Sequence, residues 1–282
     1  MVLIEHSPAV RTGAPGRSLL VDARGIRQSG IGRFLREVLA RVVRDPRFGR
    51  VALLGKPGEI AEFEEEAGCR GRVEVIPFPH HFYSPVGQAR WLALEARGAL
   101  RRDAAFFPHY DVPLPGPQPR SVVTVQDLAH FSLPYFPRWK VAMGAVVLKQ
   151  AVARAGRVLV PSRATADALV ARFPWAAPKV EAVPYGVDAR WAQPVRRLPG
   201  EVAELRPFLL CVGNRKLHKN HVAAVEALAL LRRSSPELRL VIVGHGDEDA
   251  HEVRARAEAL GVGGAVLEMQ GVPDEGLRAL YA

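Results

Sequence analysis

Short apolar runs alternate with helix-like segments along almost the whole chain, and this alternation restricts the fold more than any other feature. SLLVDARG (18–25) has the pattern of a strand and a loop, and IGRFLREVLARVVRD (31–45) follows with apolar residues at helical spacing. Strand-like runs such as RVALLG, RVEVIPF, SVVTVQD and RVLVPS recur, with helices expected over about 86–100, 138–153 and 163–172. This repetition is typical of a parallel sheet with helices on both faces, so the sequence predicts an α/β fold.

The alternation breaks once and then restarts. Residues 187–207 contain three prolines and no clear periodicity. FLLCVG then resumes the pattern, followed by helices expected over 220–233, over about 248–260 and from near Asp274. We therefore predict an N-terminal tail (1–17), a Rossmann-like domain (18–186), a linker (187–206) and a second Rossmann-like domain (207–282). In such doubly wound domains, ligands bind at the carboxyl ends of the strands.

The second domain is expected to be incomplete in the sequence as given. A six-strand doubly wound half takes roughly 130–150 residues, and about half of that follows Pro207. The last residues, LRALYA, fall inside an expected helix. A sheet of about three strands leaves an open edge, so we expect a stable first domain, a weakened second one and negligible transfer activity from these 282 residues.

Composition and charge limit the kinds of binding partner that we expect for this protein. Lysine and arginine number 39 against 29 acidic residues, a net charge of +10 that favours phosphorylated ligands or anionic membrane surfaces. The arginines are scattered and form no basic–aromatic motif, so no nucleic-acid partner is expected. Cys69 and Cys211 fit neither a disulfide framework nor a metal site, and no segment has the pattern of a signal peptide or a membrane span. We expect a cytoplasmic protein, with peripheral contact to the inner face of the membrane as an open alternative.

A basic surface is predicted near two helices, from Arg90, Arg97, Arg101, Arg102, Arg138, Lys140 and Lys149.

The most basic loop of the chain follows the strand FLLCV. In VGNRKLHKN (212–220), Arg215 and Lys219 stand just before an apolar-periodic helix, with Asn220 as a candidate N-cap. Backbone N–H groups and the dipole at a helix N-terminus attract phosphate, and the two cations supply further compensating charge. A solvated basic turn is the alternative interpretation of any single loop of this kind.

Other motifs are absent or incomplete. SGIGRF (29–34) begins like a dinucleotide-binding fingerprint, but Leu35 stands where the third glycine belongs, so Gly30 and Gly32 form either a ligand-approaching glycine loop or a plain turn. His80 and His81 lack partners at metal spacing, and no metal site is predicted. No Ser-His-Asp or G-x-S-x-G pattern occurs. His109 and Tyr110 follow the strand AAFF, where they either line a cleft or belong to a structural loop.

Several segments, taken in order, resemble the family 4 retaining glycosyltransferases (glycosyl transferase group 1), which have the two-domain GT-B architecture. The resemblance spans roughly residues 18–282 and is strongest to the mannosyl- and rhamnosyltransferase-like branch. It rests on DARGIRQSGIGRF, FFPHYDVPL, VVTVQDLAHFSLPYFP, VLVPSRATADAL, KVEAVPYGVD, VGNRKLHKN, LRLVIVGHGDE and GVPDEGLRALYA.

The resemblance implies an enzyme, a hexosyltransferase-type glycosyltransferase that needs no cofactor and takes a nucleotide-diphosphate sugar as its donor substrate. The acceptor would be a glycan or a lipid-linked or other molecule, in polysaccharide or glycoconjugate assembly. Donor contacts are implied for Gly213 and Lys219, for Arg215, whose alignment Asn214 or His218 could take instead, and for Gly30 and Gly32 across the cleft. Gln126 and Asp127 would be the catalytic pair, and His109 and Tyr110 would lie on the acceptor side.

The sequence departs from the family pattern at two places, and these departures are the reason for considering two rival hypotheses. Gln126 replaces the usual histidine before Asp-Leu; glutamine is no base, although it can hydrogen-bond a sugar hydroxyl, and the departing phosphate could itself accept the acceptor's proton. The family's Glu-x7-Glu motif has no counterpart here except Glu66 and Glu74, in the wrong domain. The first rival is therefore a truncated or degenerate non-catalytic chain that at most binds nucleotide. The second, an epimerase of the same architecture, is disfavoured because its acid/base residues have no visible counterparts.

Overall fold

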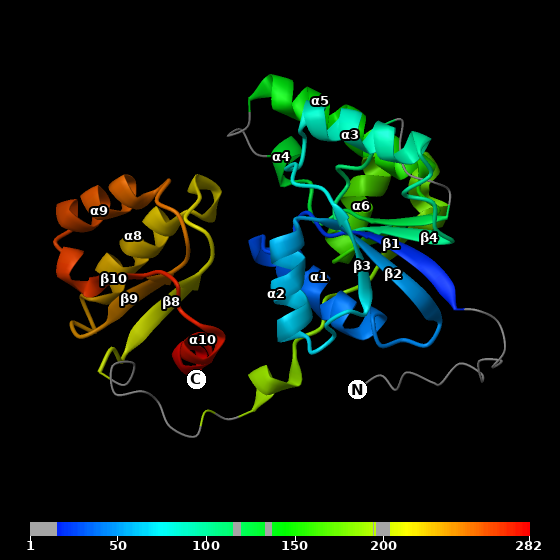
Figure 1. Cartoon of the computed structure of the whole chain (residues 1–282). Coiled ribbons are helices and arrows are strands. Elements are labelled where there is room, and N and C mark those ends of the chain that lie inside the picture. Colours follow the sequence, from blue (N-terminus) through cyan, green and yellow to red (C-terminus); the bar gives the residue numbers. More distant parts are fainter. Residues whose placement is uncertain (1–15, 115–119, 133–136, 194, 196–203) are drawn as a thin grey trace. The chain divides into compact units, whose positions relative to one another are not determined.

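The computed structural model describes residues 16–114, 120–132, 137–193, 195 and 204–282. The described residues up to Tyr185 form one compact unit, and those from Gly186 on form another (Figure 1). Most of the predicted tail, together with 194 and 196–203 of the predicted linker, lies outside the described residues.

A seven-stranded parallel sheet forms the centre of the first unit, in the order β3-β2-β1-β4-β5-β6-β7. The central strands are buried on both faces, which is why they read as continuous apolar runs such as VALL and LLV. The strands are β1 (Arg17–Asp22), β2 (Phe48–Gly55), β3 (Val73–Pro77), β4 (Ala104–Phe107), β5 (Ser121–Thr124), β6 (Arg157–Val160) and β7 (Val180–Ala182).

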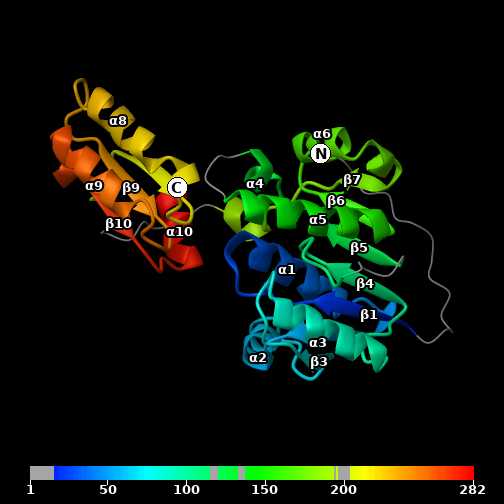
Figure 2. The same ribbon diagram turned by 90° about the horizontal axis from the view of Figure 1, so that it is seen from above.

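Helices cover both faces of this sheet (Figures 1 and 2). On one face, α1 (Ser29–Val42) and α2 (Pro57–Glu66) pack through side chains that include Leu35 and Phe63. On the other face, α3 (Pro85–Ala96), α5 (Arg138–Arg154) and α6 (Arg163–Arg172) enclose a larger core. Two short helices complete the unit, α4 (Ala129–Ser132) and the 3-10 helix η1 (Pro174–Lys179).

The strand order reverses between β1 and β4. The chain moves outward from β1 to β3, crosses back by way of α3, and then continues from β4 in the opposite direction. At such a switch point the loops after two neighbouring strands diverge and leave a crevice at their carboxyl ends. The loops that follow β1 and β4 are therefore the first place to look for a site.

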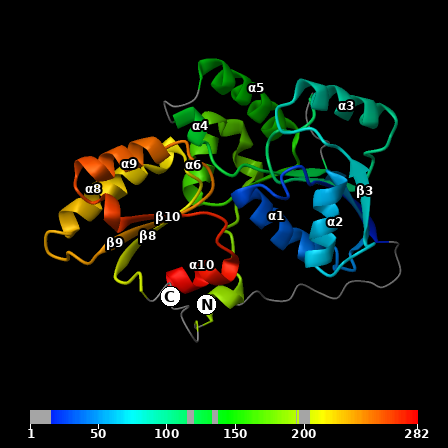
Figure 3. The same ribbon diagram turned by 60° about the vertical axis from the view of Figure 1, so that its left-hand side comes forward.

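The second unit is smaller and has three parallel strands in the order β10-β9-β8. They are β8 (Phe208–Val212), β9 (Arg239–Val243) and β10 (Val266–Met269). One face packs against α8 (His221–Leu231) and α9 (Ala250–Ala259), and the other against α10 (Asp274–Tyr281) (Figure 3). Three 3-10 turns, η2 (Ala189–Ala192), η3 (Leu217–Lys219) and η4 (Gly263–Ala265), lie in its loops.

The predicted α/β fold is confirmed. The expected helices over 138–153, over 163–172 and from Asp274 begin where predicted, and the others differ by a few residues at their ends, as frayed helix termini do. Within the described parts of the chain, no helix is long and apolar enough to cross a membrane.

Candidate functional site

A buried arginine between two buried carboxylates stands at the switch point of the first unit. Asp22 ends β1, and the Arg24 guanidinium donates to both of its oxygens, with Nε–Oδ1 at 3.0 Å and Nη2–Oδ2 at 2.8 Å. Nη1 of Arg24 donates to Asp111 Oδ2 at 3.0 Å, and Nη2 donates to the Asp111 carbonyl at 2.6 Å. Arg24 thereby joins the loop after β1 to the loop after β4.

Aromatic rings enclose this ion cluster. The Arg24 guanidinium lies 4.6 Å from the Phe82 ring centroid and 4.9 Å from that of Trp91. The His109 ring stacks on Tyr110 at 4.4 Å and tilts against Phe82 at 4.8 Å. Both proposed acceptor-side residues, His109 and Tyr110, therefore belong to this edge of the sheet, although Tyr110 is only 4% exposed. Burial raises the pKa of the Tyr110 phenol to about 12, so the phenol stays protonated at neutral pH.

Gln126 and Asp127 follow the next strand, β5, at the same edge. The Gln126 amide Nε2 donates to the Pro108 carbonyl at 3.2 Å, and its Oε1 accepts from the Tyr185 hydroxyl. The Asp127 carboxylate is exposed and accepts from the backbone N–H of Ala129 at 3.0 Å. The fold thus brings the proposed catalytic pair to the same edge as His109, with Gln126 serving as a hydrogen-bonded link between loops.

The two glycines of the first glycine loop have different surroundings. A Cβ on Gly32 would lie 2.5 Å from the Ile26 carbonyl oxygen, so its missing side chain lets α1 pack against the loop after β1. A Cβ on Gly30 would meet nothing within 4 Å. Gly30 is exposed in the first turn of α1, and of these two glycines it is the one whose backbone is open to an approaching ligand.

In the second unit, the basic loop leaves β8 at Gly213. A Cβ on the neighbouring Gly244, just after β9, would lie 1.7 Å from the Gly213 carbonyl oxygen. The two backbones pass each other with no room for a side chain at Gly244. Asn220, at φ 53°, caps α8 as predicted, because its Oδ1 accepts from the N–H of Ala223 at 3.4 Å.

Lys219 has the only ammonium group in this loop without an ion pair, among the residues that the structure describes. The neighbouring Lys216 is bound to Glu248, with Nζ 2.7 Å from Oε2. Lys219 is exposed, at the end of the short η3 turn just before α8. Its charge is therefore available to an anion at the carboxyl end of β8.

Arg215 requires a correction. We expected it to contact a diphosphate, but its side chain is 2% exposed, with Nε 2.7 Å from Asp249 Oδ1 and Nη1 2.7 Å from Glu268 Oε2. Asp249 also accepts from the buried His221, and Glu268 also pairs with Arg254. An arginine held by two carboxylates inside the unit ties the loop to β10 and to the start of α9. Of the two cations predicted to contact a diphosphate, only Lys219 is exposed.

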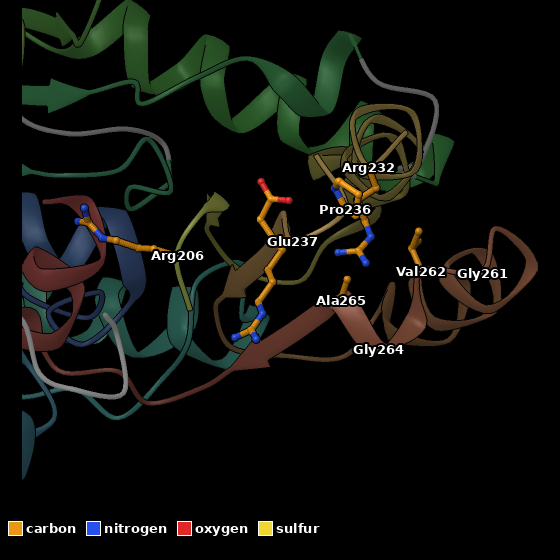
Figure 4. A pocket seen from close by; sticks show the side chains of 9 residues that line it. Arg206, Arg232, Pro236, Glu237, Gly261, Val262, Gly264 and Ala265 are labelled. Atoms are coloured by element: carbon orange, nitrogen blue, oxygen red, sulfur yellow. The ribbon is translucent and has the colours of Figure 1, made fainter. Parts of the chain in front are cut away.

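A separate hollow lies at the opposite ends of the same strands (Figure 4). Its volume is about 350 Å³, and its lining includes Arg206, Arg232 and Glu237. Figure 4 shows the Arg206 side chain extending away from Arg232, so these arginines do not converge on one point. We assign no ligand to this hollow. In the described parts of the chain, no cluster of His, Cys, Asp and Glu side chains is arranged to hold a metal ion.

Sequence reasoning missed Arg24, Asp111 and Gly244. Arg24 and Asp111 each follow a buried strand within four residues, and polar residues at the carboxyl ends of strands flanking a switch point were the available signal. Gly244 had no comparable signal, because its need for a glycine depends on how closely the segments that follow β8 and β9 approach each other, and they stay hydrogen-bonded through Gly213 N–H to Val243 O and Arg215 N–H to His245 O.

Comparisons with solved structures place this fold among known ones. The chain matches WaaG, a glycosyltransferase involved in lipopolysaccharide biosynthesis, with TM-score 0.63 and 15% identity over 93% of this chain and 72% of that one. A Listeria monocytogenes protein assigned as a UDP-N-acetylglucosamine 2-epimerase matches with TM-score 0.57 and 10% identity, over 93% and 71%. S. aureus MnaA, solved with UDP, matches with TM-score 0.53 and 11% identity, over 94% and 71%. At these identities the likeness defines the fold, which is the GT-B architecture.

Family models decide between the activities that share this fold. The model described as Glycosyltransferase Family 4 matches residues 28–191, and the one described as Glycosyl transferases group 1 matches residues 198–282. The chain therefore belongs to glycosyltransferase family 4, a family of sugar-transferring enzymes. No curated protein matches it.

Proposed function

We propose that this chain carries the site of a retaining hexosyltransferase, which moves a sugar from a nucleotide-diphosphate donor to a glycan or lipid-linked acceptor. The donor would be a substrate, and no separate cofactor or metal is invoked. The observation that carries the proposal is Lys219, at the carboxyl end of β8 and one residue before the N-cap of α8: it is an exposed cation that forms no ion pair with any residue the structure describes.

The chemistry follows from the charge that develops on the donor. As the bond between sugar and diphosphate breaks, negative charge grows on the departing phosphate oxygens. Lys219 stabilises that charge, and Gly213 in the same unit lets backbone approach the donor closely. Because the departing phosphate can accept the acceptor's proton, the glutamine at position 126 is compatible with transfer. Gln126 and Asp127 then serve as hydrogen-bond partners of sugar hydroxyls rather than as a base.

The direct test measures binding of UDP, GDP, dTDP and ADP by calorimetry, followed by transfer from the matching nucleotide-sugars. Lys219→Ala removes the exposed charge, and we expect it to weaken nucleotide binding about tenfold and to lower turnover on the order of 10²-fold. Lys216→Ala is the matched control, because Lys216 lies three residues away but is paired with Glu248. Equal and small effects of both substitutions would identify the loop as a solvated basic turn.

The stereochemical part of the proposal has its own readout. NMR of the transferred sugar should show the same anomeric configuration in product and donor. Inversion would contradict the retaining mechanism while leaving donor binding intact.

We further propose that the face of the first unit formed by α3 and α5 contacts an anionic membrane on the cytoplasmic side. Two exposed arginines, Arg90 and Arg97, lie on and just after α3, and Arg138 and Lys149 are exposed on α5. The same helices expose large apolar side chains: Leu92 (49%), Trp139 (63%), Met143 (40%) and Val146 (58%). Trp139, Met143 and Val146 follow helical spacing, so they form one apolar stripe beside the basic residues.

Two of the basic residues predicted for this surface need comment. Arg102 does not contribute, because its side chain is 8% exposed and its Nη2 lies 2.9 Å from Glu74 Oε2. The Lys140 side chain lies outside the described residues. The mixture of cations with exposed Trp, Leu, Met and Val suits the boundary between lipid headgroups and acyl chains.

A further inference from the structure

The buried ion cluster of Asp22, Arg24 and Asp111 at the switch point joins two loops and also holds two neighbouring segments. Arg24 is 7% exposed and Asp111 is 1% exposed, and each is held by several hydrogen bonds. Desolvating charges at this depth is costly, and the cost is offset only where the geometry is fixed and the groups are paired. A cluster of this kind is therefore rigid, and it restricts the positions of the segments that are hydrogen-bonded to it.

Two neighbouring segments are bound to it through Asp111. Its Oδ2, which already accepts from Arg24, also accepts from the backbone N–H of Tyr83 at 2.8 Å. Tyr83 has φ 61°, a left-handed conformation that is unfavourable for a tyrosine and needs support from its surroundings. The backbone N–H of Asp111 in turn donates to His109 Nδ1 at 2.9 Å.

This last hydrogen bond defines the protonation pattern of the imidazole. A ring nitrogen that accepts an N–H carries no proton, so a neutral His109 must carry its proton on Nε2. The ring cannot easily turn over to exchange the two nitrogens, because Tyr110 stacks on it at 4.4 Å and Phe82 lies at 4.8 Å. His109 is thus a hydrogen-bond donor of fixed direction at the edge where Gln126 and Asp127 also lie.

We propose that Arg24 is a positioning residue of the acceptor-side site: by holding Asp111, it fixes His109 as the tautomer with its proton on Nε2. The tautomer itself is a property of the free protein, and only its consequence for the reaction rests on the proposed transferase function.

The test is NMR of the imidazole nitrogens in the full chain labelled with 15N-histidine, at a pH where the rings are neutral. His109→Gln identifies the signal by its loss. In the wild type, the His109 signal should show a protonated Nε2 and an unprotonated Nδ1, with no second tautomer. In Arg24→Lys, a single ammonium cannot replace the forked contacts to Asp22 and Asp111, so a mixture of both tautomers is expected.

The matched control is Arg27→Lys, three residues along the same loop. Arg27 pairs with Glu62 and Glu66 at the surface, so this variant should keep the wild-type tautomer. If Arg24→Lys does not fold, the milder Asp111→Asn decides, because it keeps the backbone N–H but weakens the hold of Arg24. A proton on Nδ1 in the wild type, or an unchanged single tautomer in every folded variant of Arg24 and Asp111, would overturn the proposal.

Kinetics separate this proposal from the proposed function. Once a donor is found, Arg24→Lys should lower kcat on the order of 10²-fold through misplacement of His109, while nucleotide affinity stays within twofold of the wild type. A chain that shows the expected tautomers but binds none of the four nucleotides would retain the positioning role and refute the proposed function. If Arg24→Lys shows mixed tautomers but still transfers sugar at the wild-type rate, then Arg24 has no role in the reaction.

Discussion

At the scale of single residues, Gly244 tolerates a side chain least of the described glycines in the second unit, because its backbone passes so close to Gly213. Alanine at position 244 would place its Cβ 1.7 Å from a backbone oxygen, which no side-chain movement can relieve. We expect Gly244→Ala to lower the free energy of unfolding of this unit by about 1–3 kcal/mol or more, because β8 and β9 must separate. The measurement is denaturant unfolding, with hydrogen exchange to assign the loss to the second unit.

Gly264→Ala provides the comparison. A Cβ at Gly264 meets nothing within 4 Å, and the substitution reduces the freedom of the unfolded chain, so stability should stay within about 0.5 kcal/mol of the wild type or rise slightly. If Gly244→Ala behaves like Gly264→Ala, the two strands do not approach as closely as described here.

At the scale of elements, one ionic network joins the loop after β8 to α8, α9 and β10. Burial alone would raise the pKa of Asp249, but hydrogen bonds from His221 and Arg215 outweigh it and lower that pKa. The pKa of Glu268 is likewise lowered by Arg254 and Arg215 despite its burial. Removing the shared partner with Arg215→Met should cost about 3–5 kcal/mol, because Asp249 is then left buried and without Arg215.

The direction of these pKa shifts fixes a pH dependence. A carboxyl group with a folded pKa below its unfolded value stabilises the fold fully above about pH 4–5, and the stabilisation is lost as the pH falls through the lowered value. Hydrogen-exchange protection factors in the second unit, which correct for the intrinsic pH dependence of amide exchange, should therefore fall below about pH 4, and Asp249→Asn should flatten that dependence. Protection that is constant from pH 7 to pH 3 would refute the network's contribution. Asp111 in the first unit has the opposite sign, because burial raises its pKa.

At the scale of the whole molecule, the net charge of +10 gives a test of the membrane-facing surface. Sedimentation with vesicles containing anionic phosphatidylserine should be strong at low salt and weaken steeply as salt screens the charges. Arg90→Ala with Arg97→Ala should reduce binding at low salt. Trp139→Ala should reduce the part of the binding that survives at high salt, because that part depends on apolar contact.

A second pair of substitutions controls for charge alone. Arg41→Ala with Arg70→Ala removes the same total charge from exposed side chains in the α1 and α2 region, on the opposite face of the sheet. If this pair weakens vesicle binding as much as the α3 pair does, the attraction comes from net charge, and the α3–α5 face has no special role.

The sequence by itself determined the architecture, and it predicts the strand ends at which a site would lie. Strand–helix alternation, with apolar runs too continuous for one-sided strands, allows little besides a parallel sheet covered on both faces. Local rules were also sufficient where the interaction is local: Asn220 caps α8 because the N–H that it accepts lies three residues away. Lys219 could be singled out for the same reason, from its position just before a helix.

Only the tertiary structure decided which charged residues are buried in ion pairs and which stay exposed. Arg215 and Lys219 are four residues apart in the same basic loop, yet Arg215 is buried between Asp249 and Glu268, 34 and 53 residues further along the chain. Asp111 likewise meets Arg24 across 87 residues, at a reversal of strand order that local sequence does not encode. A buried charge is paired with residues that the sheet brings together from distant parts of the chain. Which residues form the pair is therefore known only once the strands are in register.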